Sequence, residues 1–467
     1  MGSTADADAV ELLGGKRREA SGPVPAQPQI PSRDRDLEEI APGRHQDSRS
    51  EDRQEHPLRI RRTIPPTAAP ISPTELLHGF RGIVDGSLAK KLEREIREHF
   101  GTEHVFLASS GKAALFLILS GLKRMSRRRK VILPAYTCFS VPSAVRMAGL
   151  EIVLCDIRPE TLDFDYPELA ELADHDTLCV IPTHLFGIPS DIAKVREICG
   201  RRGIYILEDA AQAMGVESPQ GKPGTLGDVA FFSLGRGKTL TCGSGGIILT
   251  TDADIAESIR ECASESSRVS IVEYLKDIME SVFLAIFLHP SLYWFPKLLP
   301  FLKIGETRFC RTFPVHPLTG FKAGLLQDWR AKMELHNRSR SRNAAYYMDA
   351  LGLAGRMPIY SADRSFLRFP VYAGDKRSKK ELCELGDLLG ISPMYPSSIN
   401  NIPEIRDDFH GTACPGAERI AETLVTLPTH AFLEDRDRTA VREAVTDRFR
   451  DPRNADCAVT RNASSAC

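Results

Sequence analysis

The sequence predicts an α/β protein, with a mainly parallel, helix-covered sheet in a large domain and a small C-terminal α+β domain. From Val131 to Leu249, short apolar runs alternate with segments of helical spacing, which is typical of successive βαβ units. Beyond Phe366, one strand-like run and one helical segment form a second pattern. At 467 residues the chain is also too long for one compact core, so two domains are expected.

Each predicted strand is a short apolar run. The runs begin, in chain order, at Val131, Glu151, Leu178, Ile204, Val229 and Gly246. Residues 189–203 predict a helix, because the capping pair Ser190-Asp191 precedes apolar residues that share one helical face. In the small domain, residues 366–372 predict a strand and residues 378–389 predict a helix.

Composition sets the expected boundaries. Residues 1–72 are rich in Pro, Arg, Asp, Glu and Ser, and such a segment buries too little apolar surface to offset its ordering entropy. We therefore expect a disordered tail at 1–72, a large domain at 73–340, a small domain at 341–448 and a loose tail at 449–467. Deletion of residues 1–70 should then leave the fold intact.

Charge and cysteine content exclude several classes of protein. The 61 basic and 62 acidic residues give a net charge of −1, so no global field favours nucleic acid or an anionic membrane. The 11 cysteines include no CxxC pair, which argues against zinc and disulfides and for a reduced compartment. Since no apolar signal segment follows Met1, the cytoplasm is the expected location.

The most apolar stretch is residues 282–302, inside an apolar helical insertion at about 267–315. Pro290, Pro296 and Pro300 interrupt it, so no membrane-spanning helix of roughly 20 residues is expected. A buried helical hairpin or a dimer-interface element is the first interpretation. Membrane contact or an acyl-chain groove is the alternative.

Three motifs lie at or just beyond predicted strand ends, where open α/β sheets bind their ligands. Residues 108–114 form a small-residue turn, which suits either a phosphate or a plain helix cap. Asp209 ends an apolar strand and either pairs with a protonated pyridine nitrogen or caps the next helix. Lys238 lies in a glycine-rich loop, five residues after Ser233. A desolvated lysine loses proton affinity and can condense with an aldehyde, and Ser233 could bind a phosphate.

Together these motifs resemble the sugar aminotransferases of the DegT/DnrJ/EryC1/StrS family, which are fold-type I pyridoxal-phosphate enzymes. The resemblance covers about residues 75–445. It rests on the order and spacing of Ser110-Gly111, Leu133–Thr137, Cys155–Ile157, His184–Gly187, Glu208–Gln212, Gly227-Asp228, Phe232-Ser233, Lys238, Gly243–Gly246 and Leu427-Pro428.

The resemblance implies a role for each matched residue. Lys238 would bind the cofactor covalently, Asp209 would hold the pyridine nitrogen, and Gln212 would lie beside the ring hydroxyl. The phosphate would be held by Gly111, Lys112 and Ser233. His184 would either frame the substrate or satisfy a buried hydrogen bond.

Two residues depart from the family pattern. Lys112 replaces the usual threonine, and Cys138 replaces the aromatic residue that stacks on the ring. Tyr136 or Phe139 could supply the missing stacking surface. Family members build the site at a dimer interface, so a homodimer is expected, although the Asn-Tyr-Arg motif that reaches the partner's phosphate is not recognisable before residues 318–324.

The implied function is pyridoxal-phosphate-dependent transfer of an amino group from glutamate or glutamine to a keto-sugar, with a nucleotide-linked sugar as the expected acceptor. The pathway would be polysaccharide or secondary-metabolite biosynthesis. Lys238 argues against the family's dehydratase branch, where histidine stands in its place. Two alternatives stay open: a catalytically silent ligand-binding or regulatory member, and an aminotransferase for an acyl or lipid-linked carbonyl substrate.

Overall fold

The computed structural model of the protein describes residues 62–298, 307–361 and 364–449. Its central sheet has seven strands in the order β1-β9-β8-β7-β6-β2-β3. Only β9 runs against its neighbours, so the predicted mainly parallel sheet is confirmed. The strands are β1 His104–Ala108, β2 Lys130–Pro134, β3 Glu151–Cys155, β6 Thr177–Val180, β7 Tyr205–Asp209, β8 Val229–Ser233 and β9 Gly246–Thr250.

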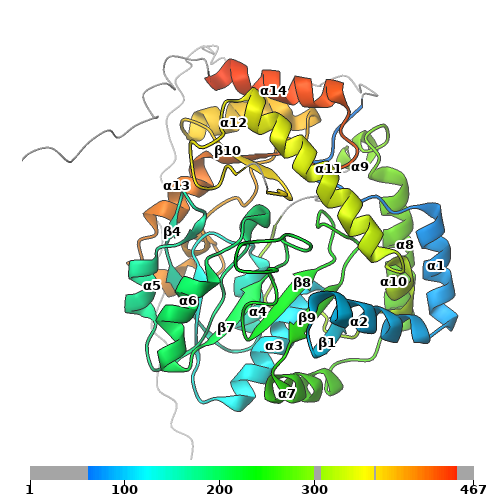
Figure 1. The fold of residues 1–467 in the computed structure, drawn as a ribbon, viewed down its shortest axis with the longest axis vertical. Coiled ribbons are helices and arrows are strands. Elements are labelled where there is room, and N and C mark those ends of the chain that lie inside the picture. The colour runs from blue at the N-terminus through cyan, green and yellow to red at the C-terminus, as the bar shows by residue number, and fades with distance from the viewer. Residues whose placement is uncertain (1–61, 299–306, 362–363, 450–467) are drawn as a thin grey trace, which may run out of the picture. The chain divides into compact units, whose positions relative to one another are not determined.

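Helices cover both faces of this sheet (Figure 1). The period-two alternation of strand side chains divides the core: Phe231 and Ile248 pack into one cluster, and Phe232, Ile247 and Leu249 into another. The first cluster includes side chains of α3 (Gly111–Met125), α4 (Ser140–Met147) and α7 (Ala253–Ser264). The second includes side chains of α2 (Ser87–Phe100) and α10 (Gly320–Leu325). A third cluster includes side chains of α5 (Tyr166–Leu172) and α6 (Ile192–Cys199).

The helix predicted at 189–203 forms as α6. Its N-cap is Asp191, whose carboxylate accepts a hydrogen bond from the backbone N–H of Lys194. Ile192 and Val195 are buried on the face that meets the sheet. The capping residue and the apolar spacing therefore position this helix as the sequence indicates.

The C-terminal part carries a second, two-stranded antiparallel sheet of β10 (Phe369–Tyr372) and β11 (Leu424–Leu427). Helices α12 (Lys376–Leu385), α13 (Pro415–Thr423) and α14 (Asp435–Phe449) accompany it. The predicted domain boundary at residue 340 falls inside the long helix α11 (Trp329–Ala350), which runs from the central sheet towards α12 and α14 (Figure 1). The two-domain division itself stays a prediction.

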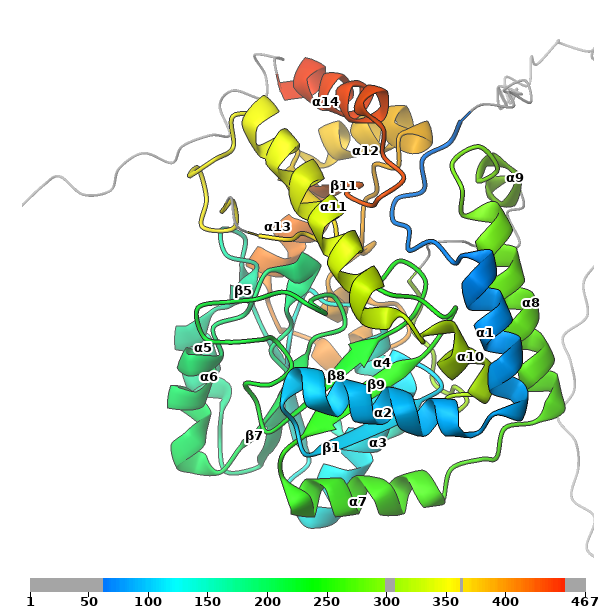
Figure 2. The ribbon, with the colours of Figure 1, turned by 45° about the vertical axis from the view of Figure 1, so that its right-hand side comes forward.

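Residues 62–72, which we call the strap, do not fit the predicted tail. Ile64, Ala68 and Ala69 are buried, and Arg62 pairs with Asp437 at 2.8 Å. The strap then runs down to the start of α1 (Figure 2). The expected boundary at 72 was wrong for these residues. The surrounding charged residues indicate disorder, but the apolar side chains of the strap are buried against the folded part of the chain. Residues 1–61 and 450–467 lie outside the described part of the chain.

The apolar insertion forms α8 (Ile271–Phe287) and the single turn α9 (Trp294–Lys297). Helix α8 lies beside α1 (Pro73–Val84) in both views (Figures 1 and 2). Ile271, Val272 and Met279, which precede the apolar stretch at 282–302 on the same helix, are more than 70% exposed. The two interpretations of that stretch, a buried helical hairpin or a dimer-interface element, stay predictions. No helix within the described ranges combines the length and the apolar character that crossing a membrane requires.

We predict that a variant without residues 1–70 is less stable than one without residues 1–61. Loss of the buried Ile64 side chain alone should cost about 1.5–3 kcal/mol, and loss of the Arg62 pair with the nearly buried Asp437 adds to it. Urea unfolding of the two truncated proteins measures the difference. Equal midpoints and slopes would show that the strap does not contribute to stability.

Candidate active site

Lys238 lies in the loop between β8 and β9, and backbone contacts hold this loop tightly. The N–H of Leu234 donates to the carbonyl of Gly245 at 2.8 Å, and Thr67 from the strap donates its hydroxyl to the carbonyl of Gly237 at 3.1 Å. Gly237 has φ +79°, and a Cβ there would lie 2.3 Å from the Thr67 side chain. The glycine is therefore required by both conformation and space.

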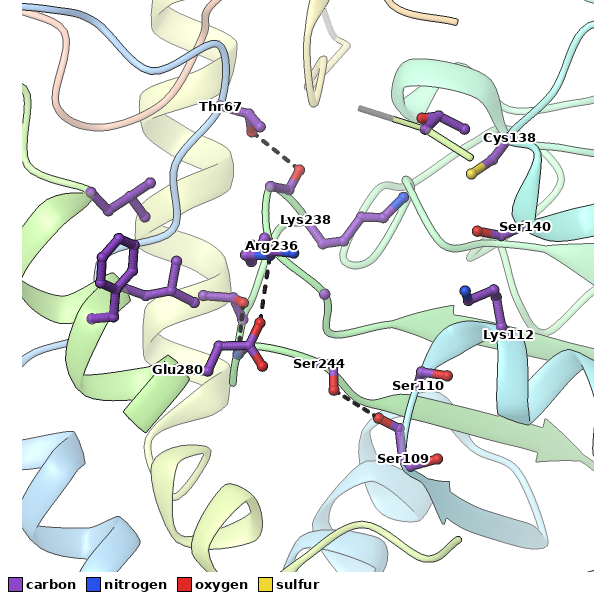
Figure 3. Close-up of a pocket in the computed structure, with 18 of the residues that line it drawn as sticks. Thr67, Ser109, Ser110, Lys112, Cys138, Ser140, Arg236, Lys238, Ser244 and Glu280 are labelled. Atoms are coloured by element: carbon purple, nitrogen blue, oxygen red, sulfur yellow. Dashed lines mark hydrogen bonds and ion pairs between the residues drawn. The ribbon is translucent and has the colours of Figure 1, made fainter. Parts of the chain in front are cut away.

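The side chain of Lys238 extends from this loop into a cavity, towards Cys138 and Ser140 (Figure 3). An inner cavity of about 150 Å³ is lined by all six predicted site residues, namely Gly111, Lys112, Asp209, Gln212, Ser233 and Lys238. It shares several lining residues with an outer cavity of about 680 Å³. The structure thus brings together residues that are spread over more than a hundred positions of sequence.

Burial changes the proton affinity of Lys238. Desolvation lowers the pKa of its amine, and the nearby cation of Arg368 acts in the same direction, whereas Cys138 and Asp209 oppose the shift. A lysine of lowered pKa has a larger fraction of the neutral amine, which is the nucleophile that attacks an aldehyde.

Asp209 ends β7 and is almost completely buried. One carboxylate oxygen accepts a hydrogen bond from the N–H of Ala211 at 3.1 Å. Desolvation raises the pKa of Asp209, an effect only partly offset by Lys238 and by that hydrogen bond. A cationic partner stabilises a buried, desolvated carboxylate, and a protonated pyridine nitrogen would be such a partner.

The opposite end of the inner cavity is formed by the N-terminus of α3 and by Ser233. Ser110 caps the helix by accepting from the N–H of Ala113 at 3.1 Å. A Cβ at Gly111 would lie 2.9 Å from the Cβ of Ser233, so only glycine lets the helix start so close to that hydroxyl. The first N–H groups of a helix have no intrahelical acceptor, which suits this end for a phosphate.

The two residues that depart from the family pattern both line the cavity. The ammonium of Lys112 lies over the ring of Phe313, 5.1 Å from its centroid. Cys138 is half-buried and occupies the cavity wall. Tyr136 and Phe139, which were expected to replace the missing aromatic surface, are instead buried and absent from the lining of both cavities. That expectation is therefore wrong, because their side chains pack into the core.

Gln212 uses both ends of its amide within the protein. Its oxygen accepts from the N–H of Phe186 at 3.2 Å, and its NH₂ donates to the hydroxyl of Tyr395 at 3.0 Å. These bonds fix the side chain at the cavity wall and join the loop after β7 to the segment that follows α12. Tyr395 itself lines the outer cavity.

Glu208 points away from the cavity, one residue before Asp209, and anchors the surrounding loops. Its carboxylate accepts from the backbone N–H groups of Gly224 at 2.8 Å and of Leu226 and Gly227 at 2.6 Å. His184 Nε2 lies 2.8 Å from it. Burial opposes the charge of Glu208, but these hydrogen bonds outweigh it and hold the pKa of the carboxyl below its usual value.

His184 is completely buried, and both of its ring nitrogens are engaged. Nδ1 accepts from the N–H of Ser190 at 3.0 Å, so Nε2 carries the proton that is donated to Glu208. Of the two interpretations of His184, the hydrogen bonds therefore support the structural one.

Helix α8 presents its acidic face to the Lys238 loop, an arrangement that local sequence patterns did not reveal. Asp277 pairs with the buried Lys322 at 2.6 Å, and Lys322 also donates to the hydroxyl of Ser244 at 2.9 Å. Glu280 lies 3.5 Å from Arg236, as Figure 3 shows. Further along, Phe283, Leu284, Phe287, Leu288, Tyr293 and Pro296 form an apolar wall of the outer cavity. The alternative of an acyl or lipid-linked substrate stays a prediction.

The described residues fit pyridoxal phosphate. A lysine of lowered pKa, a buried carboxylate without a cationic hydrogen-bonding partner, and a helix N-terminus beside a serine hydroxyl surround one small cavity. Together with the mainly parallel seven-stranded sheet, this arrangement supplies the groups that a pyridoxal-phosphate site needs.

Comparison with known proteins finds similarity to one family. The model of the DegT/DnrJ/EryC1/StrS aminotransferase family matches residues 74–289, so the chain is similar to this family over that range. GDP-perosamine synthase of Caulobacter vibrioides is 32% identical over 175 residues, which are 38% of this chain and 47% of that protein. The matched part thus spans about half the length of that relative.

Two other similarities extend over most of the chain. L-glutamine:2-deoxy-scyllo-inosose aminotransferase of Streptomyces fradiae is 26% identical over 403 residues, covering 79% of this chain and 89% of that protein. The crystal structure of a sugar aminotransferase from Micromonospora echinospora superposes with a TM-score of 0.65 at 21% identity, covering 82% of this chain and 99% of that one. The second similarity supports the fold alone.

We predict that Glu208→Gln lowers the free energy of unfolding by about 3–5 kcal/mol, because it removes one partner of a buried charged network. The carboxylate stabilises the fold above the unfolded-state pKa of about 4.3, and this contribution is lost as the pH falls through the lower folded-state value. Urea unfolding at several pH values should show the difference from wild type narrowing in acid.

The matched control for this prediction is Glu384→Gln, whose side chain is 65% exposed and which should change stability by less than about 0.5 kcal/mol. A Glu208→Gln protein as stable as this control would contradict the anchoring role.

Proposed function

We propose that this protein is a pyridoxal-phosphate-dependent aminotransferase that moves an amino group from glutamate or glutamine to a nucleotide-linked keto-sugar. The observation that carries the proposal is the meeting of Lys238 and Asp209 in one small cavity beside the N-terminus of α3. One relative is named as an L-glutamine:2-deoxy-scyllo-inosose aminotransferase and another as a GDP-perosamine synthase, and these names support this donor and acceptor class. The keto-sugar and the pathway are part of the proposal.

When bound, pyridoxal phosphate supplies a conjugated ring that delocalises the electron pair left on a carbon after deprotonation. Asp209 would keep the ring nitrogen protonated, and Ser233 with the N–H groups of Gly111 and Lys112 would hold the phosphate. Lys238 would hold the cofactor through its Nζ. The same Nζ, once free, would take and return the proton at the substrate carbon that carries the amino group.

Two further features of the proposal concern the assembly and the compartment. We infer a homodimer. The support is an exposed apolar face on α8 and α1, where the side chains of Ile271, Met279, Phe80 and Val84 are exposed to solvent. The cytoplasm is the proposed location, supported by the nine free thiols among the described residues.

The first test of the proposed function is the absorbance spectrum of the protein with added pyridoxal phosphate. A yellow band should appear and should be converted by excess glutamate or glutamine to the spectrum of the pyridoxamine form. Lys238→Ala should show neither change, because the attacking amine is absent. A colourless wild-type protein that takes up no cofactor would instead support the silent, ligand-binding alternative.

We further predict that Asp209→Asn retains the fold but slows the donor half-reaction by about two to three orders of magnitude. Loss of a buried charged partner costs roughly 3–5 kcal/mol, and each 1.4 kcal/mol is a factor of ten in rate. Stopped-flow absorbance after mixing with the amino donor measures the rate. An unchanged rate would mean that Asp209 does not act on the ring nitrogen.

A further inference from the structure

The backbone of Lys238 is held from two sides. Its N–H donates to the carbonyl of Gly235 within the same loop at 3.2 Å. Its carbonyl accepts a hydrogen bond from Nη2 of Arg340, a residue of α11, at 3.1 Å. Both bonds act on the residue whose side chain extends into the cavity (Figure 3), so together they set the point from which that side chain starts.

The two flanking carbonyls are also bonded to side chains outside the loop. The hydroxyl of Thr67 in the strap donates to the carbonyl of Gly237. Nδ1 of His336 lies 2.8 Å from the carbonyl of Thr239, and since a carbonyl only accepts, this nitrogen carries the proton. Burial lowers the pKa of His336 to about 4, so the ring is neutral at pH 7. Three consecutive peptide groups are thus fixed from outside, two of them by adjacent turns of α11.

Arg340 is both buried and charged. Only 1% of the residue is exposed. Burial lowers the pKa of its guanidinium to about 9, so the group is a cation at neutral pH. Among the described residues no carboxylate acts on this charge, and its Nε and Nη1 have no hydrogen-bond partner. A buried cation without a counter-ion costs free energy, so stability alone does not account for an arginine at this position.

Arg340 is connected to the site through the backbone. Neither Arg340 nor His336 lines the inner or the outer cavity, so a ligand bound there would not touch them. Nη2 of Arg340 also donates a weaker bond to the carbonyl of Ala68 in the strap at 3.5 Å. The guanidinium therefore joins the strap, α11 and the reactive loop at the carbonyl of Lys238.

We infer that Arg340 is a positioning residue for Lys238, with His336 in a supporting role. The inference rests on the proposed function, in which the amine of Lys238 bonds to the cofactor. By holding the carbonyl of Lys238, the guanidinium keeps the amine directed at the aldehyde. Misplacement of a reacting group by about 1 Å costs roughly 100-fold in rate. A charged donor suits this task because its hydrogen bonds are stronger than those of a neutral donor.

The test compares two forms of the cofactor that differ in whether they can bond to lysine. Pyridoxal phosphate has an aldehyde, whereas pyridoxamine phosphate has an amine in its place and binds through its ring and phosphate alone. Arg340→Met removes the donor and should weaken pyridoxal phosphate by about tenfold or more, as expected for the loss of a hydrogen bond from a charged group. It should bind pyridoxamine phosphate as wild type does. Titration calorimetry measures both affinities, and absorbance follows the yellow band.

Two further variants and a control show whether the effect is specific. Arg340→Lys keeps the charge but not the planar fork, so its loss should be smaller than that of Arg340→Met. His336→Phe removes the neighbouring donor and should give a weaker form of the same selective loss, because its bond joins two neutral groups. The matched control is Arg342→Gln, at an exposed position of the same helix, which should behave as wild type. Urea unfolding checks that each variant is folded.

The outcomes separate this inference from the proposed function. A wild-type protein that binds neither form, or that binds both without a yellow band, defeats the proposed function. If wild type gives the band but Arg340→Met loses affinity for both forms alike, the arginine shapes the site as a whole and the inference is overturned. An unchanged affinity of Arg340→Met for pyridoxal phosphate overturns it as well. Where Arg340→Met does not fold, the same comparison in Arg340→Lys decides between these outcomes.

Discussion

The buried carboxylate of Glu208 is the interaction on which the site depends. Its four hydrogen bonds join the loop after β6, through His184, to the segment that leads into β8, through Gly224, Leu226 and Gly227. Asp209 is the next residue, and its backbone N–H donates to the carbonyl of Pro182 at 2.9 Å. The position of the Asp209 carboxylate, the proposed partner of the pyridine nitrogen, is therefore fixed by the hydrogen-bonded strand ends around it. An active-site group held in this way is preorganised and loses little entropy when its ligand binds.

The loop of Lys238, at the same edge of the sheet, has its conformation fixed by its neighbours. It is confined by the strap, by α8 and by the α3 end of the cavity. Each neighbour approaches its backbone closely: Thr67 at Gly237, and Glu280 at Gly243, where a Cβ would lie 3.2 Å from the carboxylate. Glycines with positive φ at both places leave room for these contacts. The reactive lysine thus projects from a loop whose shape is imposed from outside.

Local patterns predicted the strands from Val131 onward, the cap of α6 and, around the inner cavity, the turn at 108–114, Asp209, Ser233 and Lys238. Strand periodicity, capping and glycine-rich loops are short-range signals, so the sequence alone carries them. Gln212 was implied only by the family resemblance. Strand β1 was not among the predicted runs.

The features that escaped prediction all depend on partners distant in sequence. The strap lies in a segment whose charge and proline content indicate disorder. Burial of Ile64 against residues distant in sequence stabilises its ordered conformation. The pairing of Asp277 with Lys322 follows from tertiary packing.

The contacts of the strap determine when the cavity wall can form during synthesis of the chain. Arg62 is bonded to Asp437, 375 positions further along the chain, and Thr67 from the same strap contacts the Lys238 loop. During synthesis the strap leaves the ribosome before the rest of the described chain, whereas its partner helix α14 is among the last segments to appear. The cavity wall at Thr67 can therefore reach its final form only after nearly the whole described chain has been made, so a nascent chain that stalls before α14 carries an incomplete cofactor site.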